Sequence, residues 1–372
     1  LDVQTHASLE RNAGSINDFA NSIRAMRRHE IERIGLGWMS GVIDDKASLA
    51  GMTDVYDAAI DASLTWAIRH QTQEMGLDEA PAAIAVIGMG RYGGREVNFS
   101  SDADVIIIYR PSDNADDNQA NLFARKVQED LRAILQGPTT LEPKIELDMD
   151  LRPEGKNGPL VRSYASCEEY YRSWASTWEH QALLRARYAA GDAALAEDFL
   201  MNVADPLRYP KIDLTEAQVA EIRKLKARME AERLPRGVRR DRHLKLGKGG
   251  LSDVEWTIQL LQLQHAGDNA NLRVNGTMQA LDELERRKLV SAGDAVVLRR
   301  AWWMCTAARN GSYLWSGRVN QADILPDDTY SLGGLAVYLG YDANRGQHFE
   351  NELLAVMRKA RDVTERLFYG LS

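Results

Sequence analysis

Two acidic residues open a strongly apolar segment of this chain. Asp102 and Asp104 stand two positions apart, and the segment Asp104–Tyr109 has the composition of a strand buried on both faces. Alternate side chains of a strand leave the same face, so the two carboxylates could share a pair of divalent cations. Magnesium prefers carboxylate oxygens together with substrate phosphates. The pair is therefore a candidate metal site, and together with a loop that holds phosphates it would indicate transfer of a nucleotidyl group.

A glycine-rich segment precedes the acidic pair. Residues 88–93, Gly-Met-Gly-Arg-Tyr-Gly, match G-x-G-x-x-G directly after the apolar segment 83–87, as in dinucleotide-binding folds. Only residues 94–101 then precede Asp102, which leaves little room for the crossover helix that parallel strands need. Antiparallel strands would instead bring the glycine loop, whose amides can hold phosphate oxygens, beside the carboxylates.

A third acidic group lies on a later alternating segment, residues 145–151. Asp148 and Asp150 have the same parity there, so periodicity alone does not choose between them. One of them would complete the metal site or accept the proton of an attacking hydroxyl. An isolated Asp-x-Asp is more often a solvated turn, and glycines can simply mark tight packing. The combination of loop, buried strand and acidic strand favours a site.

Helical patterns surround these strands. Ser15 predicts the cap of one helix, and a second is expected from Thr53 to Gly76. Residues 118–136 form an amphipathic pattern between the strands. The sequence predicts an N-terminal helical segment at 1–78 and a small α+β domain at 79–165.

Only helices are expected from Ser166 onward, so residues 166–372 are interpreted as a C-terminal helical bundle. Ser166 with Glu169, and Ser252 with Glu255, match the capping-box pattern. Aromatic residues recur every four positions after Ser166, and we interpret this stripe as core. It consists of Tyr170, Trp174 and Trp178. Further helices are expected at about 277–289, 291–315 and 346–369.

Composition excludes several classes of protein. The 372 residues carry a net charge of −8, which disfavours a nucleic-acid partner. Cys167 and Cys305 are the only cysteines, too few for a disulfide scaffold, and are expected to be buried thiols. No segment suits a membrane span or a signal peptide, so a cytoplasmic location is expected. The chain begins Leu-Asp-Val without methionine, which predicts a fragment of a longer protein.

Residues 88–104, Gly-Met-Gly-Arg-Tyr-Gly-Gly-Arg-Glu-Val-Asn-Phe-Ser-Ser-Asp-Ala-Asp, resemble the active-site signature of the glutamine synthetase adenylyltransferase family. That family is a branch of the DNA polymerase β-like nucleotidyltransferases. Further similar motifs follow in family order at 146–162, 177–187 and 245–256. The segments 178–181 and 232–237 resemble the C-terminal, adenylylating half of actinobacterial members. The implied fold is a nucleotidyltransferase core with a small mixed sheet and a predominantly helical remainder.

The resemblance implies catalytic and metal-binding roles for Asp102, Asp104 and Asp148, and it ranks Asp150 second. Met89 stands where the wider superfamily has serine, so backbone amides would hold phosphate, with Ser100 or Ser101 in compensation. The nucleotide-binding candidates, including two basic residues just after the third acidic strand, are Gly88, Gly90, Gly93, Gly94, Ser100, Ser101, Arg152 and Lys156. Mg²⁺ is the implied cofactor, and ATP the implied co-substrate.

The implied reaction transfers AMP from ATP to a tyrosine hydroxyl of glutamine synthetase, with Asp148 as the candidate proton acceptor. The PII nitrogen signal protein is the implied regulator. Two alternatives remain. One is phosphorolytic removal of AMP from the modified synthetase. The other is an ATP-sensing docking module without turnover.

Other polar residues have competing interpretations. The basic stretch 235–250 is either a solvated linker or a clamp on phosphates or on an acidic partner surface. Glu179, Asp253 and Glu255 could support the site, although Glu255 also suits a helix cap. The scattered histidines lack the spacing of metal ligands.

Overall fold

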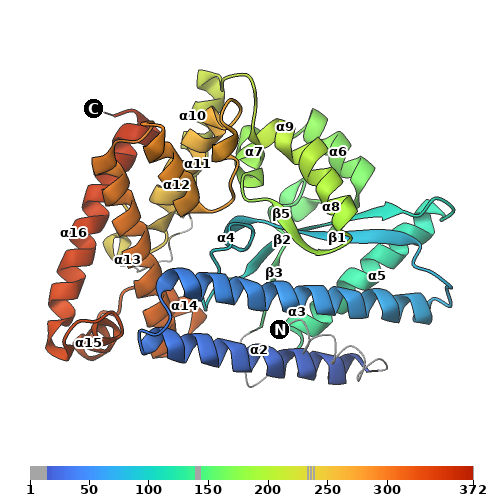
Figure 1. Ribbon diagram of the computed structural model, residues 1–372, viewed down its shortest axis with the longest axis horizontal. Helices are drawn as coiled ribbons and strands as arrows, with labels where there is room; N and C mark the ends of the chain where they lie inside the picture. Colours follow the sequence, from blue (N-terminus) through green and yellow to red (C-terminus); the bar gives the residue numbers. More distant parts are fainter. Residues whose placement is uncertain (1–14, 139–143, 233, 235–236, 238, 372) are drawn as a thin grey trace. The chain divides into compact units, whose positions relative to one another are not determined.

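The computed structural model describes residues 15–138, 144–232, 234, 237 and 239–371. The chain divides into two compact units. The first unit consists of residues 1–40, 47–97 and 101–207, and the second of residues 41–46, 98–100 and 208–372. The chain is an α+β protein, with its sheet in the first unit (Figure 1).

The first unit combines helices with a small sheet. Its helices are α2 (Ile16–Met39), α3 (Asp45–Glu74), α4 (Gly90–Gly93), α5 (Asp117–Gln136), α6 (Tyr164–Ser173), α7 (Thr177–Leu183), α8 (Ala193–Phe199) and α9 (Asp205–Arg208). Its strands are β1 (Ala82–Gly88), β2 (Ala103–Pro111), β3 (Leu147–Asp148), β4 (Val161–Ser163) and β5 (Arg187–Gly191). The first two residues of α3 and the last residue of α9 belong to the second unit.

The five described strands form one mixed sheet of order β3-β2-β1-β5, with β4 also pairing with β2. β1 and β2 are antiparallel, and Gly88 lies opposite Val105. This confirms the antiparallel arrangement expected from the short segment between the strands. β3 and β4 both run parallel to β2, and Asp104 is in register with Asp148. The end of β1 therefore lies beside the beginning of β2, and β3 pairs with the beginning of β2 on its other edge.

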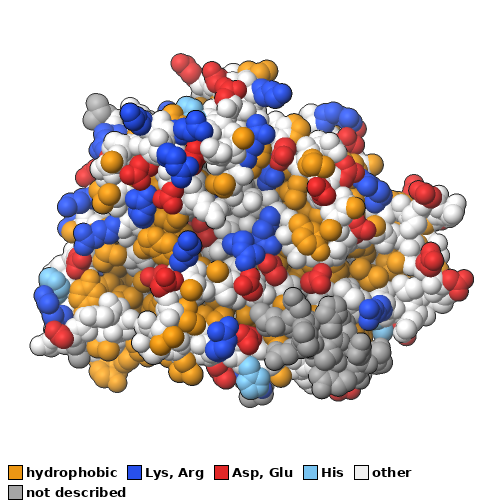
Figure 2. Space-filling model, viewed as in Figure 1, with side chains coloured by type: hydrophobic (Ala, Val, Ile, Leu, Met, Phe, Trp, Pro, Cys, Tyr) orange, Lys and Arg blue, Asp and Glu red, His pale blue; other side chains and the backbone are white. Residues whose placement is uncertain are grey.

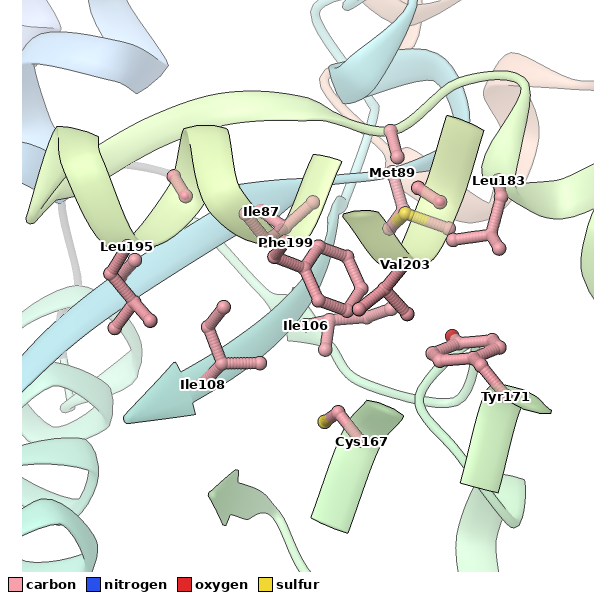
Figure 3. Packing of buried hydrophobic residues seen from close by; sticks show 14 residues of the cluster. Ile87, Met89, Ile106, Ile108, Cys167, Tyr171, Leu183, Leu195, Phe199 and Val203 are labelled. Carbon is pink, nitrogen blue, oxygen red and sulfur yellow. The ribbon is translucent and has the colours of Figure 1, made fainter. Parts of the chain in front are cut away.

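The apolar strands are buried on both faces, as predicted. Ile87, Ile106 and Ile108 pack against Phe199 of α8 and Tyr171 of α6 (Figure 3). α5 packs against β1 and β2 as well, and α2 packs against α5. The sheet is thus held between helices, as burial of two apolar faces requires.

Among the early helices, the predicted cap of α2 is confirmed, but the predicted start of α3 is not. Ser15 caps α2, and its Oγ accepts a hydrogen bond from Asp18 N at 3.3 Å. α3 begins at Asp45 rather than at Thr53, so the predicted start was wrong by two turns. α5 matches the predicted amphipathic helix. Residues 1–14 of the predicted N-terminal segment lie outside the described residues.

The predicted strand over residues 145–151 was wrong in length. β3 comprises only Leu147 and Asp148, and the chain then turns, with Arg152 N donating to Met149 O at 3.1 Å. Alternation of apolar and polar residues suits a strand, but here it continues through a turn in which Met149 is buried and Leu151 is half-buried.

Helices do not continue unbroken after Ser166. β5 joins the edge of the sheet at Arg187–Gly191, which corrects the expectation of helices alone. Ser163, and not Ser166, caps α6, because its Oγ accepts from Ser166 N at 3.3 Å. α6 ends at Ser173, and Trp174 is 75% exposed, so the aromatic stripe was wrongly interpreted as a continuous core face.

The second unit is helical where described. Its helices are α10 (Glu216–Glu232), α11 (Leu251–His265), α12 (Thr277–Arg286), α13 (Ala292–Ser316), α14 (Val319–Ala322), α15 (Thr329–Tyr338) and α16 (Gly346–Thr364). The predicted helices at 277–289, 291–315 and 346–369 are confirmed, with a π-helical turn Glu365–Tyr369 after α16. Gly250 is the N-cap of α11, so the expected Ser252–Glu255 capping box is wrong.

The surface mixes both signs of charge. On the face drawn in Figure 2, Lys and Arg side chains are interspersed with Asp and Glu side chains. Each described helix is too short or too polar to span a lipid bilayer. Cys167 and Cys305 are buried free thiols, as expected, and burial raises the pKa of Cys167 to about 12.

Candidate active site

Three carboxylates meet at one end of the sheet. Asp102, Asp104 and Asp148 each offer one oxygen, and these oxygens lie within 4.8 Å of one another. The parallel register of β2 and β3 places Asp148 beside Asp104, and Asp102 immediately precedes β2. Asp102 is exposed and the other two are half-buried. The structure therefore brings together the three acidic residues that the sequence singled out.

Asp150 occupies a different position. β3 ends at Asp148, so the strand parity that made the two residues equivalent no longer applies. The Asp150 backbone N–H donates to Asp148 Oδ1 at 2.8 Å, and Asp150 Oδ2 lies 3.3 Å from Lys156 Nζ. Its carboxylate thus pairs with a lysine, whereas the carboxylate of Asp148 joins the cluster.

The electrostatics of the cluster favour a cation. Partial burial raises the pKa of Asp148, and the negative charges of Asp150 and Asp102 raise this pKa further. The hydrogen bond from the Asp150 backbone N–H acts in the opposite direction and lowers it. Three carboxylates this close repel one another unless a positive charge lies between them. Oxygen donors alone suit a hard divalent ion such as Mg²⁺. The residues present therefore fit the metal that the sequence implies.

The glycine loop lies against this cluster at Gly90. The backbone N–H of Met89 donates to Asp104 O at 2.8 Å. Gly90 has φ +50, and a Cβ there would lie 2.1 Å from Asp104 Oδ2. Only glycine combines this conformation with such a close approach to a carboxylate. Gly90 thus has a specific reason to be glycine at the site.

The other predicted glycines are buried. A Cβ on Gly93 would lie 2.1 Å from Arg185 O and 2.5 Å from Gly88 O, so close packing accounts for this glycine. Gly94 ends the short helix α4 and donates to Gly90 O at 3.0 Å. A phosphate-binding role for these glycines stays a prediction.

Ser100 and Ser101 are both buried, and neither lines the cavity that adjoins the carboxylates. Ser101 O accepts a hydrogen bond from Tyr56 Oη at 2.8 Å. Ser100 Oγ has no hydrogen-bond partner within the described part of the chain. Their predicted compensation for the missing superfamily serine remains a prediction.

A cavity of about 630 Å³ opens beside the carboxylates, and we call it the acidic cavity. Its lining residues are Asp102, Arg132, Gln136, Lys144, Glu146, Leu147, Asp148, Met149, Asp150, Arg152, Lys156 and Leu160. This volume falls within the range typical of small-molecule sites. The cavity combines acidic residues that could hold a metal with basic residues that could contact phosphates.

The two predicted basic residues differ in their surroundings. Lys156 is exposed, and its ammonium is within reach of the cavity. Arg152 is buried, and its guanidinium donates to backbone oxygens of Met149, Lys156, Gly158 and Pro159. Arg152 therefore holds the loop beside the cavity in place. The guanidinium nitrogens that would bind a phosphate already donate to backbone oxygens.

Two basic residues were missed by the sequence reasoning. Arg132 on α5 and Lys144 before β3 line the cavity, and both are exposed. Arg132 Nε donates to Gln136 Oε1 at 2.8 Å. Arg132 comes near the acidic residues because α5 packs against β3, which no local motif reveals, whereas Lys144 lies just before β3 in the chain.

The other polar residues raised from the sequence have structural contacts. Glu179 forms a capping box with Ser176 and accepts from Tyr170 Oη at 2.9 Å. Asp253 pairs with buried Lys226 in the second unit. Glu255 lies on α11 and does not form the expected capping box. Of the basic stretch 235–250, positions 235, 236 and 238 lie outside the described residues.

Comparison with known sequences gives two family matches. The family model described as glutamate-ammonia ligase adenylyltransferase matches residues 2–202. The model described as GlnD PII-uridylyltransferase matches residues 220–368. The first match contains the whole acidic cavity, and the second lies within the helical unit.

Similar curated proteins share one description, bifunctional glutamine synthetase adenylyltransferase/adenylyl-removing enzyme. One from Bifidobacterium longum strain DJO10A is 79% identical over 370 residues, which is 100% of this chain and 34% of that protein. One from Mycobacterium avium strain 104 is 42% identical over 97% of this chain and 36% of its own length. The chain thus spans about a third of the length of the curated relatives it matches.

Proposed function

Because this chain belongs to the glutamate-ammonia ligase adenylyltransferase family, we propose that it transfers AMP from ATP to a tyrosine hydroxyl of glutamine synthetase. The observation that carries the proposal is the carboxylate cluster of Asp102, Asp104 and Asp148 beside a cavity with basic walls. The relatives' description names the same substrate protein. The chain is a nucleotidyltransferase, and we expect it to act in the cytoplasm, where ATP is available.

The three carboxylates would hold Mg²⁺, which when bound neutralises phosphate charge and stabilises the leaving pyrophosphate. The tyrosine oxygen attacks the α-phosphorus of ATP, and the bond between that phosphorus and the bridging oxygen of the β-phosphate breaks. A tyrosine hydroxyl has an ordinary pKa of about 10, so its proton must be removed. Asp148, at the edge of the cluster formed by strands β2 and β3, is the candidate acceptor of this proton.

The basic wall of the cavity binds the triphosphate. Lys144 and Lys156 present exposed ammonium groups, and Arg132 adds a guanidinium from α5. Gly90 leaves room for the Asp104 carboxylate to reach the cluster. These groups bind and orient the nucleotide against the carboxylates, which is the main contribution a protein makes to phosphoryl chemistry.

The test is labelling of glutamine synthetase with radioactive AMP from α-labelled ATP and Mg²⁺. We expect the wild-type chain to label the synthetase and Asp104→Asn to lose at least about a thousandfold in rate, because removing a metal ligand removes electrostatic stabilisation of the transition state. Asp113→Asn is the matched control: this exposed residue lies after β2, away from the cavity lining. Persistent labelling by a folded Asp104→Asn protein, or no labelling by the folded wild type, contradicts the proposal.

A second candidate is phosphorolytic removal of AMP, which the relatives' description as bifunctional supports. In that reaction a phosphate oxygen attacks the AMP phosphorus, the bond to the tyrosine oxygen breaks, the tyrosine regains a proton and ADP forms. Incubating AMP-modified synthetase with phosphate separates the candidates: ADP release supports removal, and its absence alongside AMP transfer supports addition alone.

We also propose that the PII signal protein regulates this chain through residues 220–368. The support is the match of that segment to a family whose description names PII. Surface plasmon resonance with immobilised PII should detect binding. If the chain binds ATP and PII but neither adds nor removes AMP, the docking-module alternative replaces the enzymatic proposals.

A further inference from the structure

A second cavity lies within the helical unit. It encloses about 900 Å³ between the segment 239–248 and α16. Its lining residues are Arg239, Arg240, Asp241, Lys248, Leu354, Ala355, Met357, Arg358, Lys359, Arg361, Asp362 and Glu365. Twice as many of these side chains are cationic as are acidic. This concentration of positive charge is notable because the chain as a whole carries a net charge of −8.

Three of the cations have no partner within the part of the chain that the structure describes. Lys248, Arg358 and Lys359 are exposed and make no hydrogen bond or ion pair with a described residue. By contrast, Arg239 Nη2 lies 2.6 Å from Asp241 Oδ2, and these two charges largely offset each other. The cavity therefore retains positive charge that an anion could neutralise.

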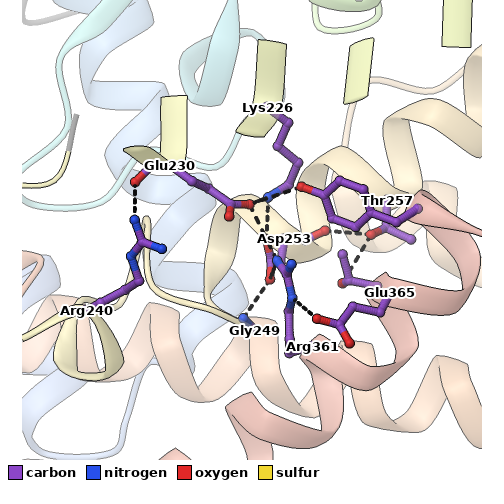
Figure 4. Close-up of polar contacts among 10 residues, drawn as sticks. Lys226, Glu230, Arg240, Gly249, Asp253, Thr257, Arg361 and Glu365 are labelled. Atoms are coloured by element: carbon purple, nitrogen blue, oxygen red, sulfur yellow. Dashed lines mark hydrogen bonds and ion pairs between the residues drawn. The ribbon is translucent and has the colours of Figure 1, made fainter. Parts of the chain in front are cut away.

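The base of the cavity is a fixed arginine. Arg361 Nη1 lies 3.1 Å from Asp253 Oδ2, and its Nε donates to Glu365 Oε1 at 2.8 Å (Figure 4). Buried Lys226 pairs with both Asp253 and Glu230 and offsets part of their negative charge. Arg361 Nη2 has no partner among the described residues. Its guanidinium is thus oriented by the network while one nitrogen stays available to a ligand.

The glycine-rich loop that carries Lys248 is built against α16. Gly249 has φ +73, and a Cβ there would lie 1.7 Å from Met357 O. Its backbone N–H donates to Asp253 Oδ2 at 2.7 Å. The backbone of this loop therefore packs directly against the backbone of α16. The buried carboxylate of Asp253 contacts both Gly249 and Arg361. Lys248 is held near Arg358 and Lys359 without any contact that uses its charge.

The remaining wall is apolar. Leu354 and Ala355 of α16 are half-buried and line the cavity. A concave volume of this size, with apolar and cationic walls, suits a small organic anion better than the flat contact of a protein surface. We propose that this cavity binds a phosphorylated organic anion of nucleotide size, with its phosphates on Lys248, Arg358, Lys359 and Arg361.

The test is isothermal titration of the full chain with ADP in EDTA, so that the metal-free carboxylates of the acidic cavity repel the phosphates. We expect binding of one ADP, weakened at least tenfold in Arg358→Ala/Lys359→Ala. The matched control is Lys224→Ala/Arg228→Ala, which removes the same two charges from exposed positions on α10. This control should bind ADP as the wild type does. Circular dichroism checks that both variants are folded.

Several results would overturn the proposal. The first is the absence of ADP binding to the wild type, and the second is equal binding by Arg358→Ala/Lys359→Ala. Loss of binding in Lys144→Ala/Lys156→Ala alone would place the nucleotide in the acidic cavity instead. Inorganic pyrophosphate that binds as tightly as ADP would exclude a role for the apolar wall. Binding of a polyglutamate peptide without ADP would indicate a docking surface for an acidic protein.

Discussion

Gly90 shows how a single backbone position can control the acidic site. Its φ of +50 and the 2.1 Å approach of a hypothetical Cβ to Asp104 Oδ2 leave no space for a side chain. We expect Gly90→Ala to displace the Asp104 carboxylate and to lower AMP transfer at least about tenfold, since a misplacement of about 1 Å can cost that much or more. Rates of synthetase labelling measure the effect.

Gly76→Ala is the control for backbone strain alone. Gly76 has φ +63, but nothing lies within 4 Å of a Cβ built there. It should lose about 1 kcal/mol of stability and keep its rate of labelling. If both variants lose activity equally, the displacement of Asp104 is not the cause.

His243 should make the stability of the second unit depend on pH. Its Nδ1 accepts from Leu246 N at 3.1 Å, and burial lowers its pKa from the ordinary value of about 6.5. Below that pH the unfolded chain takes up a proton that the folded chain resists, so the free energy of unfolding falls as pH falls. Between pH 7.5 and 5.5 this single group should contribute a loss of at most about 1.4 kcal/mol.

Urea unfolding at the two pH values tests this effect. His243→Asn keeps an acceptor in place of Nδ1 but cannot titrate, so its loss between the two pH values should be smaller than that of the wild type. His29→Asn changes an exposed histidine of the first unit and should show the wild-type loss. Identical pH dependence in all three proteins would contradict the assignment.

At the scale of elements, Trp174 lies in the break between α6 and α7, whereas Phe199 lies at the end of α8. Phe199 of α8 is 0% exposed within the core cluster, and Trp174 after α6 is 75% exposed. Phe199→Ala should destabilise the protein by about 3–5 kcal/mol, through lost burial and a cavity. Trp174→Ala should stay within about 0.5 kcal/mol of wild type. Urea titrations of both variants measure these values, and comparable losses would contradict the interrupted helix.

The same elements show where local patterns fail. Apolar and polar residues alternate over 145–151, but β3 ends at Asp148. The chain turns there, and the Arg152 guanidinium stabilises the turn by donating to Met149 O and Gly158 O. The cap at Ser15 was predicted from local sequence, because a cap depends only on a side chain and the next turn. β5 could not be predicted in this way, because its pairing with β1 joins segments about a hundred residues apart.

For the whole molecule, ligand binding should appear as increased stability. A ligand that binds only the native protein at about 100 times its dissociation constant adds about 2.7 kcal/mol. We expect Mg²⁺ with a non-cleavable α,β-methylene ATP analogue to raise the thermal midpoint of the wild type. Asp104→Asn should lose most of this shift, and EDTA should abolish it in both proteins. Differential scanning fluorimetry measures the shift, and an equal shift in the variant would contradict a role for Asp104 in metal binding.

The sequence by itself determined the chemistry available to this protein. Acidic residues two apart at the start of a buried strand, a glycine loop and a later acidic segment predicted antiparallel strands and a small α+β domain. The resemblance of the motifs at 88–104, 146–162, 177–187 and 245–256 indicated the family. Such features are local, because strand periodicity and loop length depend on residues near one another in the chain.

The family resemblance ranked Asp148 above Asp150, and the tertiary structure places Asp148 in the carboxylate cluster while Asp150 pairs with Lys156. Only the tertiary structure placed Arg132 and Lys144 beside the cluster and joined β5 to the sheet. It also assembled the basic cavity of the second unit from a loop and a helix about a hundred residues apart. These arrangements depend on where a strand ends and on which distant surfaces pack together. The physical reason is that burial of apolar surface stabilises contacts between segments however far apart they are in the sequence. A local sequence pattern therefore does not predict which segments will pack together.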